Sequence, residues 1–312
     1  MIKKIQYNTC GLLLSLLALG SGSLSADSMS EPVLEPLSEP FIVTSIKPLA
    51  IIAQSAVGDQ ARVEYLLPDN QSPHDFSLPV SALKKIASAE LVVWIGPGFE
   101  TRSAKTMAKL PPSKLITAMD QIDPLAGDAA VAAGSHSKAM SADPHLWLDP
   151  DYGNAIAAEI QARLGLPIRQ IIGQDEIQAL RASMAASQDK TYLSHHDAYD
   201  HFVRAFELPA GLSLRDARGS VKGVQSQYQL RKTIMASNIS CIFVEPQYQG
   251  KDAAAVAAEF ALPLVALDPQ GLSQPLNHEA YSQFIGSLVA QFKACFQSVS
   301  YTHLTLPTKR IV

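Results

Sequence analysis

The sequence predicts an α/β protein with two βα lobes, each containing a mainly parallel sheet, joined by a connecting helical segment. Short runs rich in Val, Ile and Leu alternate with stretches of helical spacing in both halves of the chain. These runs lack strict polar alternation, which indicates parallel strands covered on both faces. A chain of 312 residues that is 47% hydrophobic and 17% charged is long enough for two such domains and too apolar for disorder.

The N-terminal lobe is predicted to span residues 41–150. Its apolar runs predict strands at residues 41–46, 62–68, 90–96 and 114–119. Helical spacing predicts helices at residues 49–57 and 79–89, and a third from about Glu100. Residues 120–142 are rich in small side chains and have little periodicity, so they predict a long loop.

Residues 151–189 predict the helical connection between the lobes, with helices at 151–164 and 175–188. The C-terminal lobe is predicted to span 190–298. Its strands are expected at residues 190–196, 241–246 and 262–269. Its helices are expected at residues 197–206, 225–237, 252–260 and 279–296. In such folds a ligand binds at the carboxyl ends of the strands, so the cleft between the lobes is the expected site.

The N-terminus predicts export. Lys3 and Lys4 precede an apolar run at 11–19 that is too short to span a bilayer, and small residues follow up to Ala26. Residues 1–26 are therefore interpreted as a signal peptide, with a buried N-terminal helix as the alternative. The proline-rich and acidic residues 27–40 predict a disordered leader. The mature protein is expected to be exported and soluble.

The net charge and the cysteine content bear on nucleic-acid binding and on disulfide formation. The formal net charge is −4, and the chain has no basic runs interleaved with aromatic residues, which argues against nucleic-acid binding. Cys10 lies within the predicted signal peptide, leaving Cys241 and Cys295. In an oxidising compartment two cysteines are expected to form a disulfide. Two buried free thiols are the alternative.

Three histidines and one carboxylate stand at the ends of strand-like runs. They are His74 in SPHDFSLP, His145 in DPHLWLDP, His196 in SHHDAYDHF and Asp268 in LPLVALDPQG. They are far apart in the sequence, so only the folded chain can bring them together. Because the carboxyl ends of parallel strands share one edge, we expect all four in one cleft. Three imidazoles with a carboxylate or a water suit Zn²⁺.

Neighbouring residues leave several alternatives. Strand alternation allows only one of His195 and His196 to face the cleft, and the HDAY context favours His196. Glu245 in FVEPQ either orients a ligand histidine through its second nitrogen or forms an ion pair that fixes its loop. Asp268 is either a ligand or an outer acceptor. His201 is expected on a helix surface. Three further acids are expected in loops or helix caps: Asp143, Asp149 and Asp197.

Residues 41–298 resemble the periplasmic zinc-binding components of ABC uptake transporters, the ZnuA type of the cluster A-I (family 9) solute-binding proteins. The resemblance lies in FIVTSIKPLA, LLPDNQSPHDFSLPVSALKKIASAELVVWIGPGFE, DPHLWLDP, SHHDAYDHF, CIFVEPQY and LVALDPQG. It implies two lobes joined by a long helix that open little on metal binding. It also implies zinc ligation by His74, His145 and His196. The residue at the position of Asp268 is a ligand in some members and is replaced by water or another carboxylate in others.

The resemblance carries further expectations. It implies a disulfide between Cys241 and Cys295, and the segment 165–189 is short for the connecting helix. The tail 299–312 has no counterpart; it resembles a translated adapter sequence, and we assign it no function. The implied function is zinc capture in the periplasm and delivery to the membrane permease of an ABC transporter, by a monomer that is not an enzyme.

Two other functions are alternatives. A zinc hydrolase also uses three protein ligands, but the chain lacks HExxH, and Glu245 is the one candidate base. The same fold also serves as an adhesin or as a manganese or iron receptor. Manganese-binding relatives tend to replace the third histidine with an acid, so His196 favours zinc.

Overall fold

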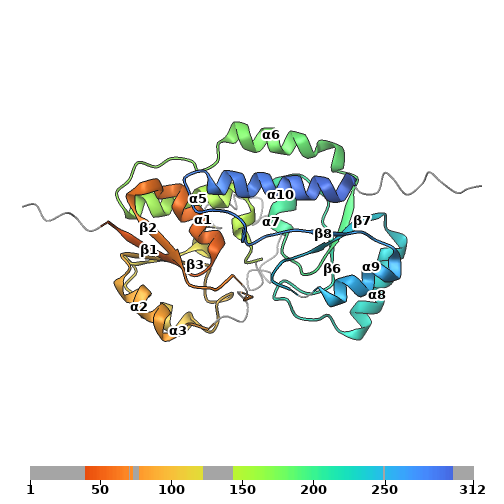
Figure 1. Cartoon of the computed structure of the whole chain (residues 1–312), viewed down its shortest axis with the longest axis horizontal. Coiled ribbons are helices and arrows are strands. Elements are labelled where there is room, and N and C mark those ends of the chain that lie inside the picture. Colours follow the sequence, from red (N-terminus) through yellow and green to blue (C-terminus); the bar gives the residue numbers. More distant parts are fainter. Residues whose placement is uncertain (1–38, 70, 73–76, 122–142, 249, 298–312) are drawn as a thin grey trace, which may run out of the picture. The chain divides into compact units, whose positions relative to one another are not determined.

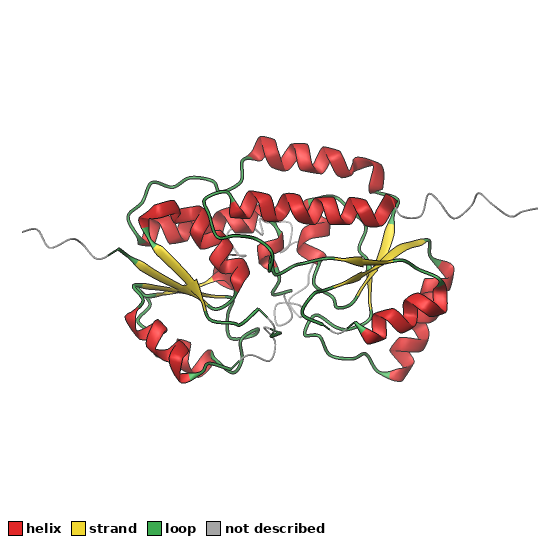
Figure 2. Ribbon diagram, in the orientation of Figure 1, coloured by secondary structure: helices red, strands yellow, loops and turns green. Residues whose placement is uncertain are grey.

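The computed structural model describes residues 39–69, 71–72, 77–121, 143–248 and 250–297. These residues form two four-stranded parallel sheets with flanking helices, which confirms the predicted α/β class (Figures 1 and 2). Every helix in these ranges is too short or too polar to span a membrane. His74 lies outside the described residues, as do the predicted signal peptide, most of the leader and of the 120–142 loop, and the whole of the tail.

The first sheet has the strand order β2-β1-β3-β4, all parallel. Its strands are β1 (Phe41–Thr44), β2 (Arg62–Tyr65), β3 (Leu91–Trp94) and β4 (Leu115–Thr117). Both central strands, β1 and β3, are buried along their whole length, as their unbroken apolar runs predict. The helices are α1 (Lys47–Val57), α2 (Val80–Ser88) and α3 (Ala104–Met107). The helix predicted from Glu100 begins only at Ala104, because a turn closed onto the Gly96 carbonyl comes first.

The second sheet repeats this order as β6-β5-β7-β8. Its strands are β5 (Thr191–Ser194), β6 (Leu212–Ser213), β7 (Ile239–Val244) and β8 (Leu264–Ala266). The helices are α7 (Asp200–Ala205), α8 (Val224–Ala236) and α9 (Lys251–Phe260). The sequence did not predict β6, because two residues are too few to show a strand pattern. Strands β1 and β3 lie side by side in the first sheet, and β5 and β7 do so in the second. The carboxyl ends of such strands form the usual ligand-binding edge.

Three more helices connect and cover the sheets: α5 (Pro150–Arg163), α6 (Gln174–Met184) and α10 (Ala280–Gln297). Helix α5 packs on α1, and α10 contacts α1, α6 and β7 (Figure 1). The apolar side chains of α10 recur every three or four residues and are buried, and they join residues of both sheets in one core. A disulfide links Cys241 in β7 to Cys295 in α10, with 5.5 Å between their Cα atoms, so this prediction is confirmed.

Candidate metal centre

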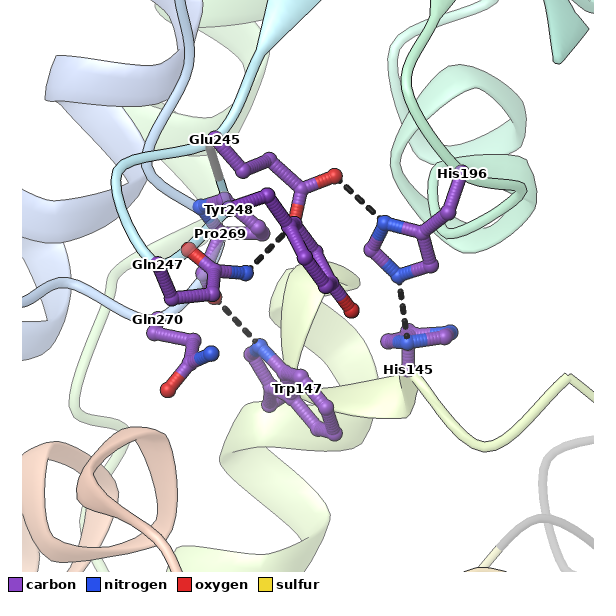
Figure 3. Close-up of a pocket in the computed structure, with 8 residues that line it drawn as sticks. All are labelled: His145, Trp147, His196, Glu245, Gln247, Tyr248, Pro269 and Gln270. Atoms are coloured by element: carbon purple, nitrogen blue, oxygen red, sulfur yellow. Dashed lines mark hydrogen bonds and ion pairs between the residues drawn. The ribbon is translucent and has the colours of Figure 1, made fainter. Parts of the chain in front are cut away.

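Two of the predicted ligands meet in the structure. His145 precedes the 3₁₀ helix Leu146–Leu148, and His196 lies two residues beyond the end of β5. Their Nε2 atoms face each other at 3.3 Å (Figure 3), and both residues are 2% exposed. We call this pair the His145–His196 centre.

A carboxylate holds the other nitrogen of each ring. Asp143 Oδ1 lies 2.6 Å from His145 Nδ1, and Glu245 Oε1 lies 2.5 Å from His196 Nδ1. An ionised carboxylate can only accept a hydrogen bond, so each Nδ1 donates its proton and each Nε2 keeps its lone pair. This is the arrangement by which proteins orient metal-binding histidines.

The distance between the rings fits a zinc ion. Zinc binds imidazole nitrogen at about 2.0–2.1 Å, and tetrahedral angles then place two ligand nitrogens about 3.4 Å apart. The observed 3.3 Å between the two Nε2 atoms agrees with one edge of such a tetrahedron. Two lone pairs facing each other at this distance suit a cation shared between them.

Asp143 is a functional neighbour that the sequence prediction missed. Its Oδ1 also accepts the backbone N–H of His145 at 3.1 Å, so the expected role as a loop acid is present as well. Burial opposes the ionisation of Asp143, but His145 and His201 together favour the carboxylate and lower its pKa overall. The signal in the sequence is an acid two residues before a ligand histidine.

The prediction that His201 is a surface residue is wrong. His201 lies in α7 and is buried, because this face of α7 covers the segment around Asp143. Its Nε2 donates to the backbone carbonyl of Asp143 at 2.8 Å. Arg204, one turn later, donates from Nη2 to His201 Nδ1 at 2.8 Å. His201 and Arg204 thus tie α7 to the segment that carries His145.

Glu245 lies just beyond the end of β7 and is 2% exposed. Its Oε2 accepts a hydrogen bond from Gln247 Nε2 at 2.6 Å, while Oε1 contacts His196. Both oxygens of this buried carboxylate are therefore engaged. The contact with His196 Nδ1 is the one required if Glu245 orients a ligand histidine.

Asp268 has a different environment. Its Oδ2 accepts the backbone N–H of Leu272 at 2.6 Å, and its Oδ1 accepts that of Gln270 at 3.2 Å. Burial raises the pKa of the Asp268 carboxyl, and these backbone hydrogen bonds oppose the rise. Its neighbours Pro269 and Gln270, but not Asp268 itself, line the small pocket at the His145–His196 centre (Figure 3).

The remaining lining residues come from both sides of the centre. They are Trp147, Gln247 and Tyr248, beside His145, His196 and Glu245 (Figure 3). Trp147 donates from Nε1 to the carbonyl of Pro269 at 2.8 Å, and its ring lies 5.2 Å from that of His145. This hydrogen bond connects the segment of His145 with the loop that follows β8.

His195 and His196 have different partners. His195 Nε2 lies 3.1 Å from Asp252 Oδ1 in α9, and the centre of its ring lies 4.5 Å from that of the Tyr248 ring, which is tilted against it. Burial lowers the pKa of His195, although the charge of Asp252 opposes the shift. The structure therefore brings His145 and His196 together, with Glu245 beside them, and directs the Nε2 edge of His195 toward α9.

A comparison with models of protein families shows which family the chain belongs to. Residues 42–166 and 174–295 match the model of ZnuA, the periplasmic component A of the zinc-uptake complex. The chain belongs to the ZnuA family. The match includes His74, His145, His196 and Asp268.

Individual proteins named ZnuA are similar to this chain over most of its length. The high-affinity zinc uptake system protein ZnuA of Haemophilus ducreyi is 28% identical over 290 residues, covering 81% of this chain and 92% of the relative. The protein of the same name from Yersinia pestis is 28% identical over 296 residues, covering 84% of this chain and 92% of that protein.

Solved structures show the same fold. A crystal structure of ZnuA is 25% identical and superposes with a TM-score of 0.64, covering 82% of this chain and 99% of that one. The periplasmic zinc-binding protein TroA of Treponema pallidum is 17% identical, with a TM-score of 0.67, covering 83% of this chain and 99% of TroA. The likeness to TroA supports the fold alone.

Proposed function

We propose that this ZnuA-family protein captures Zn²⁺ in the periplasm and delivers it to the membrane permease of an ABC zinc importer. The observation that carries the proposal is the pair of buried Nε2 atoms at 3.3 Å in the His145–His196 centre. The relatives from Haemophilus ducreyi and Yersinia pestis are named as high-affinity zinc uptake proteins, which supports the same function.

The proposed ligands are His74, His145 and His196, with Asp268 or a water in the fourth position. Coordination by Asp268 requires its carboxylate to release the N–H groups of Leu272 or Gln270. A set dominated by imidazole nitrogen suits zinc better than manganese, which prefers more oxygen ligands.

Asp143 and Glu245 prepare the site for the cation. By accepting the Nδ1 protons they fix the neutral tautomer of both rings and keep each Nε2 as a ligand atom. The rings of Phe99 and Trp147 lie 5.9 and 5.2 Å from that of His145 and limit its movement. Zinc binding competes with protonation of the ligand histidines, so we expect affinity to fall as the pH decreases.

A binding role is favoured over hydrolysis. In a hydrolase a carboxylate beside the zinc removes a proton from the attacking water. Glu245 is the candidate base, and His196 and Gln247 engage both of its oxygens. We therefore propose that the protein binds its solute and is not an enzyme. We further propose that it is exported and monomeric.

Calorimetry tests the proposal. The mature protein should bind one Zn²⁺ per chain, and His145→Ala should weaken binding at least about 100-fold, because it removes one of three imidazole ligands. His278→Ala is the matched control, since the His278 side chain is 77% exposed and lies beside its exposed neighbour Glu279. Absence of stoichiometric binding, or equal affinities of the His145 and His278 variants, contradicts the proposal.

A further inference from the structure

A third buried histidine repeats the arrangement of the other two. His195 Nε2 lies 3.1 Å from Asp252 Oδ1, and the second oxygen of Asp252 accepts from Arg215 Nε at 2.8 Å. The carboxylate accepts, so His195 Nε2 carries the proton and Nδ1 keeps the lone pair. The carboxylate–histidine contact that prepares His145 and His196 is thus present at His195, with the roles of the two nitrogens exchanged.

The lone pair of His195 Nδ1 has no hydrogen-bond partner among the described residues, although the atom is buried and the residue is 2% exposed. Leaving a buried acceptor unpaired costs about 1–3 kcal/mol. The position of His195 is nevertheless well determined by the backbone. Its N–H donates to Phe243 at 3.0 Å, and its carbonyl accepts from Arg215 at 3.1 Å, which extends the ladder of the second sheet.

The surroundings of His195 supply further cation ligands. One ligand atom each of His195, His196 and Glu245 lies within 4.8 Å of the other two, and all three residues are buried. Two imidazoles and one carboxylate form a ligand set that zinc accepts in open protein sites. Because the three residues lie at the carboxyl ends of β5 and β7, the second sheet alone assembles this group.

We propose that His195, His196 and Glu245 form a second divalent-cation site, which holds Zn²⁺ transiently beside the His145–His196 centre. This inference rests on the proposed function, because the second site serves the same cation. His195 supplies Nδ1, His196 supplies Nδ1 and Glu245 supplies a carboxylate oxygen.

The two sites exchange one ion and do not fill together. A neutral imidazole has one lone pair, so His196 binds zinc through Nε2 at the first site or through Nδ1 at the second. Moving the ion to the second site transfers the ring proton of His196 from Nδ1 to Nε2, and Glu245 changes from hydrogen-bond acceptor to metal ligand. Simultaneous occupancy requires a doubly deprotonated ring, which is unfavourable near neutral pH.

One proposed ligand of the second site, His195, also lines a separate pocket. This pocket is lined by His195, Arg215, Tyr248, Gly250, Lys251 and Asp252. Tyr248 lines both this pocket and the small pocket at the His145–His196 centre. His195 lines the separate pocket, and His196 lines the small one. The proposed second site thus shares His195 with the separate pocket, and His196 and Glu245 with the small pocket.

The test uses a chain in which the first site has been removed. The double variant His74→Ala/His145→Ala should still bind one Co²⁺ per chain, more weakly than the wild type, and the visible absorption of Co²⁺ reports its nitrogen and oxygen ligands. Adding His195→Asn should weaken this residual binding at least about tenfold. Adding His278→Asn to the same double variant is the control, and it should leave the binding unchanged.

The outcomes separate the two proposals. Loss of tight Zn²⁺ binding by His145→Ala tests the proposed function, whereas the residual Co²⁺ binding tests only the second site. The second site is refuted if the double variant binds no Co²⁺ or if His195→Asn leaves its affinity unchanged. His195→Gln is the second variant, and matching thermal midpoints of all variants show that they are folded.

In the otherwise unaltered chain, His195→Asn provides a kinetic readout. The transfer of Zn²⁺ to an excess of a chromogenic chelator should slow at least about threefold relative to both the wild type and His278→Asn. A structural role of His195 alone predicts no selective change in the transfer rate, so unchanged kinetics contradict the proposed exchange.

Discussion

At the scale of single residues, the two nitrogens of each imidazole in the His145–His196 centre have different roles. Asp143 and Glu245 accept the Nδ1 protons of His145 and His196, and each Nε2 is directed at the other. The ligand geometry is therefore set before the ion arrives, which lowers the reorganisation that binding requires. The acids matter as much to this geometry as the histidines do.

Replacing Asp143 tests this view. Asp143→Ala removes the acceptor of His145 Nδ1, so the ring can rotate or adopt the other tautomer, and zinc affinity should fall about 10- to 100-fold. Competition with a chelator of known affinity measures the effect. Asp120→Ala is the control: it removes an exposed carboxylate three residues beyond the end of β4 and should leave the affinity unchanged. Equal affinities of the two variants contradict the orienting role.

Glu100 makes folding stability depend on pH. Burial raises the pKa of its carboxyl from 4.5 to about 7, although the N–H of Gly96 donates to Oε2 at 3.0 Å. The folded state therefore holds the proton more tightly than the unfolded chain does. The stabilising contribution is complete below about pH 4.5 and is lost as the pH rises through about 7.

Glu100→Gln removes this dependence. Relative to the wild type, the variant should gain up to about 3 kcal/mol of unfolding free energy between pH 4.5 and 7.5, at about 1.4 kcal/mol per pKa unit. Urea unfolding of both proteins across this range measures the difference. A constant difference at all pH values contradicts the assignment to Glu100.

At the scale of elements, the ends of strands position the chemistry. His196 follows β5 and Glu245 follows β7. Because these strands are neighbours in the second sheet, the two side chains are close enough for their short contact. The sequence predicted these positions because apolar runs that end in polar residues reveal the carboxyl ends of parallel strands. The fold class and most elements could be predicted for the same reason.

Contacts made through loops could not be predicted in this way. The role of Asp143 depends on a local turn around His145, and the burial of His201 depends on how α7 covers that turn. Neither has a periodic signal in the sequence. The position of His74 is outside the described residues, so its ligand role stays a prediction, and that of Asp268 does so as well.

The disulfide joins two elements with a large separation in the chain. Cys241 in β7 and Cys295 in α10 are 54 residues apart. Replacing both with Ser should lower the unfolding free energy by about 4 kcal/mol on the chain-entropy model, because the unfolded chain regains the freedom of a long loop. Guanidinium unfolding measures the loss. Unchanged stability contradicts this expectation, whereas zinc stoichiometry should stay at one.

At the scale of the whole molecule, α10 connects the parts that build the centre. Phe284 and Phe292 of this helix belong to a single core that includes residues of both sheets. Tyr281, at its start, is fully buried and donates from its hydroxyl to the carbonyls of Trp147 and Asp149, at 3.0 and 3.1 Å. The segment that follows His145 is thus held against α10, so packing far from the proposed zinc ligands contributes to their geometry.

Alanine substitutions at two glycines distinguish the effect of this packing from the effect of helix propensity. A Cβ atom at Gly153 in α5 would lie 2.1 Å from the Tyr281 hydroxyl, whereas one at Gly286 in α10 has no neighbour within 4 Å among the described residues. In a helix interior Ala is favoured over Gly by roughly 0.5–1 kcal/mol. Gly286→Ala should therefore stabilise the protein by about that amount.

Gly153→Ala gains the same propensity but forces the Tyr281 ring away from Trp147 and Asp149. Overpacking of this kind costs typically about 1–3 kcal/mol, so the net effect should be destabilising. Thermal unfolding should show midpoints that shift in opposite directions for the two variants. Because the displaced hydroxyl holds the segment after His145, Gly153→Ala should also weaken zinc binding, and Gly286→Ala should not. Equal zinc affinities of the two variants would show that α10 supports the fold without shaping the metal centre.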